Sequence, residues 1–153
     1  MDAALSLTPA GARFTLLHVT SAEVPDAARG AYAGLFGRGY RADEDPGTRL
    51  EQLAATSASD LLEAAADRLG RRCERLEIQG RTERAVVAAS ADADLLVVAR
   101  DGDRTRLGPK SLGKITRFVV DHAACPVLLV WPESAPDVAT IPPPPHHPSP
   151  PDR

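Results

Sequence analysis

The stretch from Asp94 to Trp131 reads DLLVVARDGDRTRLGPKSLGKITRFVVDHAACPVLLVW. It contains two short apolar runs, 95–99 and 127–131, and such runs are typical of strands that are buried on both faces of a parallel sheet. Between them lie a basic, glycine-bearing loop, 100–112, and a helical pattern, 113–124. A strand, a loop, a helix and a second strand in this order predict a βαβ unit.

The loop of this unit is where we expect a ligand. In open α/β sheets, ligands sit where a loop leaves the carboxyl end of a strand and a helix begins, which places a site between Arg100 and Ile115. From Arg100 to Arg117 the sequence has six cations and two carboxylates, a local balance of +4, whereas the whole chain carries −3. A basic loop on an acidic body favours a small anion and disfavours nucleic acid. A merely solvated loop is the open alternative.

Composition predicts one globular domain. The chain has 153 residues, of which 43% are apolar and 25% are charged, and this is typical of a soluble protein with a single hydrophobic core. No apolar run approaches the roughly 18–20 residues of a membrane helix, and the amino terminus lacks a secretory pattern. Cys73 and Cys125 are too few for a disulfide framework. We therefore expect a cytoplasmic protein with reduced thiols and no membrane contact.

The other regular elements follow from local patterns. The run 14–20 predicts a strand, and the alternation in 75–79 predicts a half-exposed one. A long helix is expected to begin at Asp45-Pro46, to present an apolar stripe that includes Leu53 and Leu61, and to stop at Gly70. Glycines disfavour a long helix between 21 and 47 and leave only a short one, 26–36. Residues 133–153, rich in proline, are expected to form a disordered tail.

From Phe14 to Trp131 the chain resembles a universal stress protein domain. The resemblance rests on DLLVVARDG at 94–102 and on RFVVDHAACPVLLV at 117–130, where a helix closes on His-Ala before Cys-Pro-Val and a Val/Leu strand. It suggests a divergent, actinobacterial-type member of that family. The implied fold for residues 1–132 is α/β, a three-layer, Rossmann-like open parallel sheet with helices on both faces.

The resemblance also implies a nucleotide loop, although an altered one. Family members that bind nucleotides carry Gly-x-x-Gly, nine residues, and then Gly followed by Ser or Thr, because glycines let the backbone approach phosphates. Here the first glycine is replaced by Ala99, and Gly113 comes one place late and precedes Lys114. Asp101 would face the phosphates unfavourably. ATP is the cofactor that such a site suggests, but the sequence does not require one. The residues of this degenerate site are Val19, Ala99, Gly102, Gly113, Lys114 and Ile115.

The amino terminus departs further from the family. Family members begin with a central strand that ends in an adenine-recognising Asp, whereas Asp2 to Leu7 resembles only the end of the helix that follows. We therefore expect an amino-terminally truncated sheet. Either a strand encoded upstream fills the gap, or the strands 14–20 and 95–99 close up and pair directly, since buried backbone cannot stay unpaired.

Three functions are consistent with these features. The first is a non-catalytic stress-response protein that acts through partner contacts and through a homodimer formed by the strand Val127–Trp131, with degenerate nucleotide or anion binding at most. Trp131 packing against the preceding helix is the alternative to an interface. The second function is an ATP-binding switch that uses the Gly102–Lys114 loop. The third function is an enzyme. It is disfavoured because Ser111 has no histidine near it in the sequence and because His122 lies on the apolar face of its predicted helix. No metal-ligand spacing is present.

Overall fold

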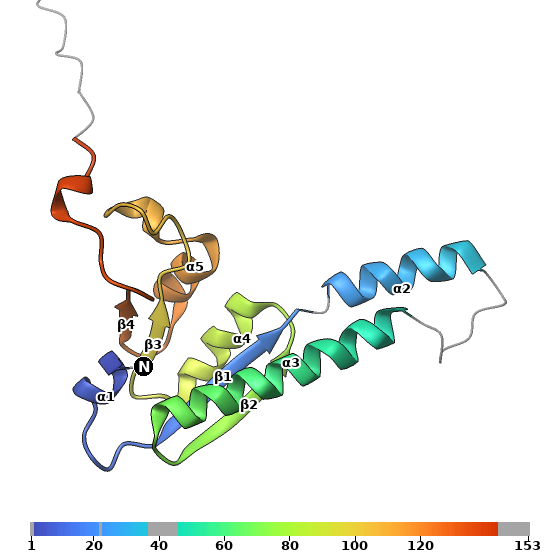
Figure 1. Ribbon diagram of the computed structural model, residues 1–153, viewed down its shortest axis with the longest axis horizontal. Coiled ribbons are helices and arrows are strands. Elements are labelled where there is room, and N and C mark those ends of the chain that lie inside the picture. The colour runs from blue at the N-terminus through green and yellow to red at the C-terminus, as the bar shows by residue number, and fades with distance from the viewer. Residues whose placement is uncertain (1, 22, 37–45, 144–153) are drawn as a thin grey trace, which may run out of the picture.

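The structure is a computed structural model that describes residues 2–21, 23–36 and 46–143 (Figure 1). Its helices and strands follow one another in the order α1 (Asp2–Leu7), β1 (Phe14–Thr20), α2 (Glu23–Phe36), α3 (Pro46–Leu69), β2 (Cys73–Gln79), α4 (Thr82–Ala89), β3 (Leu96–Ala99), α5 (Lys114–His122) and β4 (Val127–Val130). Short 3-10 turns, η3 (Ser90–Asp92), η4 (Pro109–Ser111) and η5 (Val138–Thr140), follow α4, precede α5 and follow β4. The predicted alternation of parallel strands and helices is confirmed.

The described strands form two parallel pairs. β1 pairs with β2 from Phe14↔Cys73 to Thr20↔Gln79, and β3 pairs with β4 from Leu96↔Val127 to Ala99↔Val130. Direct pairing of β1 with β3, one of the two predicted outcomes, is wrong for the described residues. β1 lies in one two-stranded sheet and β3 lies in the other. Helix α4 contacts both β1 and α5. The two pairs are thus linked through a helix and not through a shared strand.

Among the described residues, the buried core is small and comes from two helices. Its apolar members are Ala58, Leu62 and Leu69 of α3 and Val119 of α5. Most residues of β1, β3 and β4 are only half-buried. The sequence predicts strands buried on both faces, and the difference has a simple cause: a sheet of two strands is too narrow for its helices to cover both faces completely.

Helix α3 extends beyond the sheet on which it packs. It has 24 residues, about 36 Å at ~1.5 Å per residue, whereas the seven residues of β1 span about 23 Å. The surplus lies alongside α2, away from the strands (Figure 1). Leu53 is 67% exposed and Leu61 is 56% exposed, so the prediction that both lie in the buried stripe is wrong. The predicted stop is confirmed, since Gly70 has a φ of +62°.

Helix α2 is longer than the sequence predicts. It runs over 14 residues and passes through Gly30 and Gly34. Its contacts with α3 supply the tertiary packing that overrides the weak helix propensity of glycine. Among the described residues, no helix combines the length and the apolar character needed to span a membrane.

The chain after β4 follows a defined path as far as residue 143. In this segment the side chain of Asp137 caps η5, because the Ala139 N–H donates to Asp137 Oδ1 at 2.7 Å. Figure 1 shows the segment rising beside the loop that precedes α5. The expectation of a disordered tail over residues 133–153 stays a prediction. Residues 144–153 lie outside the described part of the chain.

Candidate functional site

The loop between β3 and α5, residues 100–113, folds back on itself through its own backbone. The Gly102 N–H donates to the Ser111 carbonyl at 3.1 Å, and the Asp103 N–H donates to the Lys110 carbonyl at 2.8 Å. The two arms approach so closely that a Cβ on Gly102 would collide with the Lys110 carbonyl oxygen and lie 2.8 Å from the Ser111 carbonyl carbon. Glycine at this position is thus explained by packing within the loop.

A carboxylate of the loop occupies the start of α5. Asp101 Oδ1 accepts a hydrogen bond from the Gly113 N–H at 2.7 Å, and Oδ2 accepts one from the Thr116 N–H at 3.4 Å. The first amides of a helix have no partner within the helix, and together with the helix dipole they attract an anion. A Cβ on Gly113 would lie 2.7 Å from this carboxylate. Asp101 therefore stands where a bound anion would lie.

Both aspartates of the loop are stabilised in their charged form. Burial raises the pKa of Asp101, but hydrogen bonds from Thr116 and from the Gly113 amide outweigh burial and leave that pKa below its ordinary value. For Asp103, hydrogen bonds from the Thr105 hydroxyl and amide and from Arg106 lower the pKa to about 2. Both groups are anions at neutral pH.

Much of the positive charge of the loop is engaged in intramolecular contacts at the surface. Arg106 Nε lies 2.8 Å from Asp103 Oδ2, and Arg104 Nη1 lies 3.7 Å from Glu133 Oε1. Arg117 Nη2 donates to the carbonyls of Pro109 at 2.9 Å and of Leu112 at 3.4 Å. These contacts tie the loop to itself, to α5 and to the segment after β4.

Arg100 joins the loop to the end of β4. Its Nη1 donates to Ser111 Oγ at 2.6 Å, and its guanidinium carbon lies 4.8 Å from the ring centroid of Trp131, within the range of a cation–π contact. Arg100 Nε is buried and has no hydrogen-bond partner among the described residues. The structure thus places Trp131 against Arg100; the two roles predicted for it, at an interface or packed on the preceding helix, stay predictions.

The structure brings most of the predicted site residues together. The Ala99 carbonyl accepts from Thr116 Oγ1 at 3.3 Å, and Gly102 and Gly113 flank Asp101. Lys114 and Ile115 open α5, and the Ile115 side chain is 42% exposed. Val19 does not join them through the sheet, because it pairs with Ile78 in the other strand pair.

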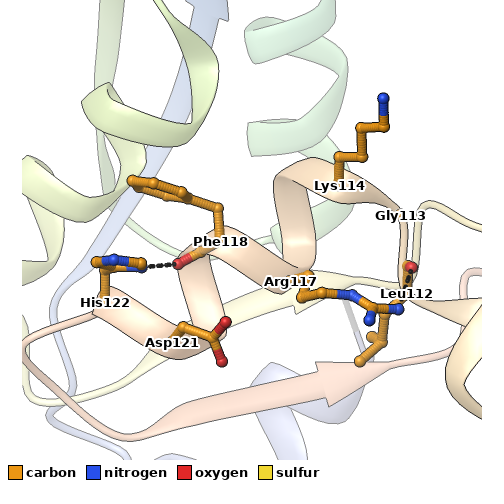
Figure 2. Close-up of a pocket in the computed structure, with 7 residues that line it drawn as sticks. All are labelled: Leu112, Gly113, Lys114, Arg117, Phe118, Asp121 and His122. Carbon is orange, nitrogen blue, oxygen red and sulfur yellow. Dashed lines mark hydrogen bonds between the residues drawn. The ribbon is translucent and has the colours of Figure 1, made fainter.

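An open depression lies along α5, next to the loop (Figure 2). Its lining residues are Leu112, Gly113, Lys114, Arg117, Phe118, Asp121 and His122. The imidazole of His122 stacks on the ring of Phe118, with centroids 4.1 Å apart, and its Nδ1 lies 2.8 Å from the Phe118 carbonyl oxygen. Arg117 turns toward Leu112, whereas Lys114 points away from it.

No catalytic pairing is apparent among the described residues. The hydroxyl of Ser111, the nucleophile considered in the sequence, donates to the Gly108 carbonyl at 2.7 Å and accepts from Arg100. The ring of His122 is bonded to the backbone of its own helix. The described part of the chain also holds no cluster of three or more His, Cys, Asp or Glu side chains suited to a metal ion.

The role of Asp101 was missed by reasoning from sequence. One signal was available: the N-cap of α5 is Gly113, which has no side chain to cap the helix. Because Ser, Thr, Asp and Asn are strongly preferred as helix caps, a helix that begins with glycine needs a polar partner from elsewhere. The carboxylate twelve positions earlier supplies it.

Comparison with known proteins agrees with this architecture. A model of the universal stress protein family matches residues 2–130. Among solved structures, the chain is similar to hypothetical protein MJ0577, which was a test case for the structure-based assignment of biochemical function. The TM-score is 0.65 at 18% sequence identity, and the match covers 88% of this chain and 86% of that one. A search of curated proteins gave no match. With its Rossmann-like α/β fold, this chain belongs to the universal stress protein family.

Proposed function

We propose that this protein is a non-catalytic universal stress protein that acts through protein contacts and whose loop holds no nucleotide. The position of Asp101 carries the proposal. Its carboxylate takes the amide of Gly113 that a phosphate would need, and it places a negative charge where the phosphate would lie. Family membership supports the stress-protein role.

The other amides of the loop support the same conclusion. A phosphate loop works by presenting free N–H groups to the anion, whereas here six N–H groups of the loop have internal acceptors. These are Ser111 O for Gly102, Lys110 O for Asp103, Asp103 Oδ1 for Thr105, Thr140 Oγ1 for Leu107, Gly108 O for Ser111, and Pro109 O for Leu112. A nucleotide would have to break several of these bonds before it gained its own.

The ATP-binding switch is the second candidate, and one observation favours it. Lys114, the first residue of α5, is exposed and points away from Arg117 (Figure 2). A cation at this place is available to a phosphate that approaches from solvent. The switch requires Asp101 to leave the helix start when ATP arrives.

Isothermal titration with ATP separates the two functions. We expect no heat of binding at millimolar ATP for the wild-type protein and measurable binding for Asp101→Gly, in which the first amides of α5 are free. Asp103→Asn removes an equal charge elsewhere in the loop and serves as the matched control; it should not bind. Micromolar binding by the wild-type protein that disappears in Lys114→Glu would overturn the proposal in favour of the switch.

We further propose that the outer edge of β4 forms a homodimer. The carbonyls of Pro126 and Val130 accept from Leu96 and Arg100 of the β3 arm at 2.9 Å. Backbone groups alternate in direction along a strand, so the Leu129 N–H points to the other side, where β4 has no neighbour among the described strands. Such an edge is suited to pairing across a two-fold axis.

Sedimentation equilibrium tests the dimer. Proline at an outward-facing position removes a donor from the edge but leaves the β3–β4 ladder intact. We expect a wild-type dimer and a folded, monomeric Leu129→Pro variant, with circular dichroism as the check on folding. A monomeric wild-type protein, or a folded variant that still dimerises, would contradict this edge as the interface.

A further inference from the structure

We propose that residues 131–142, which we call the strap, form a latch that holds the loop 100–113 closed. The strap leaves β4 and runs along the outside of the loop (Figure 1). The inference concerns how the loop is kept in place, and it goes beyond the question of what the loop binds. It stands whether or not the edge of β4 forms a dimer.

The strap contacts the loop at three places and approaches it at a fourth. The ring of Trp131 lies 4.8 Å from the guanidinium carbon of Arg100, and Glu133 Oε1 lies 3.7 Å from Arg104 Nη1. Farther along, Thr140 Oγ1 accepts a hydrogen bond from the Leu107 N–H at 3.0 Å. Pro142 Cδ comes within 3.9 Å of the position that a Cβ on Gly108 would take. The strap thus follows the loop from its start at Arg100 to its tip at Gly108.

Thr140 is the central contact of the latch. Its hydroxyl donates to the Asp137 carbonyl at 2.6 Å while it accepts from the Leu107 N–H, so a single group bridges the strap and the loop. Two further bonds shape η5 around Asp137: the Thr140 N–H donates to the Asp137 carbonyl at 3.0 Å, and the Ala139 N–H donates to its carboxylate. The turn therefore holds the Thr140 hydroxyl in place for Leu107.

The strap is held by polar contacts and not by apolar burial. Val138 is 71% exposed and Ile141 is 53% exposed, and the side chains of the Arg104–Glu133 pair are 57% and 83% exposed. Segments with few buried apolar contacts open at a much lower free energy than the core. The strap can therefore open while the rest of the domain stays folded, and its release would free the Leu107 amide and Arg104 and would expose the face of Arg100 that Trp131 covers.

Hydrogen exchange of the full-length chain, followed by NMR, tests the latch. Thr140→Val removes the acceptor of Leu107, so exchange at the Leu107 amide should rise about fivefold, the factor that one net hydrogen bond typically supplies. If the strap holds the loop, the Gly102 and Asp103 amides should exchange faster as well. The amides of the β1–β2 ladder, which lies outside the loop, should not change. Thr140→Ser keeps the hydroxyl and should behave as the wild-type protein does.

Asp137→Ala provides an independent variant, because it loosens η5 without altering Thr140. The proposal requires it to give the same pattern. Exchange should be faster at Leu107, Gly102 and Asp103, and the exchange rates in the β1–β2 ladder should not change. Acceleration confined to Leu107 would show a local hydrogen bond and no latch. No change at all, or acceleration throughout the molecule, would also overturn the proposal.

Discussion

Replacing Gly102 by alanine tests whether the loop is packed as tightly as its backbone contacts indicate. The new Cβ would collide with the Lys110 carbonyl oxygen and lie 2.8 Å from Ser111 C and 2.9 Å from Gly113 N. All three neighbours are backbone atoms, which cannot rotate away as the end of a side chain can. The two arms of the loop must therefore separate.

The separation has a calculable cost. It breaks or lengthens two backbone hydrogen bonds, from Gly102 to Ser111 and from Asp103 to Lys110. Each is worth about 0.5–1.5 kcal/mol, so we expect the variant to lose roughly 2 kcal/mol of unfolding free energy. Two-state urea unfolding, followed by circular dichroism without any nucleotide, measures this loss as a lower midpoint at an unchanged slope.

Gly30→Ala is the matched control. A Cβ on Gly30 meets no atom of the described residues within 4 Å, and Gly30 lies inside α2, so the same substitution should stabilise the protein by about 0.5–1 kcal/mol. If Gly102 is present only to let a phosphate approach, Gly102→Ala will unfold at the wild-type midpoint in the absence of ligand. That result would refute the packing explanation.

Three further predictions concern the core, pH and a buried hydroxyl. Leu62→Ala should cost about 2–5 kcal/mol of unfolding free energy, because Leu62 is only 8% exposed. Leu53→Ala should change it by no more than about 0.5 kcal/mol, because Leu53 is 67% exposed. Urea unfolding measures both changes. The folded-state pKa of Asp103 lies at about 2, below its ordinary 3.8, so its stabilisation is present above about pH 4 and is lost as the pH falls toward 2; thermal melts of wild-type protein and Asp103→Asn should converge there. Ser90→Ala should lower stability by about 1–3 kcal/mol in the same melts, because the Ala124 N–H loses its acceptor, the Ser90 hydroxyl at 3.0 Å; an unchanged melting temperature would contradict this role.

The local elements could be predicted from the sequence because their signals are local. The strand expected at 95–99 is β3, Leu96–Ala99, and the helix expected at 113–124 is α5, Lys114–His122. A continuous apolar run, with a glycine at the boundary of the element, is enough to place such elements. The long helix was found for the same reason, since proline at its start and Gly70 at its end mark it directly.

Features that depend on distant contacts could not be predicted. Only the charge of Asp101 could be read from the sequence, because its function as a helix cap depends on how the loop returns to α5 twelve residues later. Proline content identified the segment after residue 132 as a tail, yet Thr140 binds a loop 33 positions earlier. The separation of the strands into two pairs is likewise set by packing and not by any local pattern.

The basic character of the loop has a structural explanation that needs no ligand. Asp101 and Asp103 bring negative charge into the loop, and Arg106 and Arg104 neutralise Asp103 and Glu133. A carboxylate that caps α5 makes an anion unnecessary at the helix start, but it also fixes negative charge beside a crowded backbone turn. Guanidinium groups offset negative charge elsewhere in the loop, at Asp103, and hold the loop through hydrogen bonds from Arg100, Arg106 and Arg117. Retained cations in a family loop are therefore poor evidence for a retained phosphate, and the positions of the loop amides are the better guide.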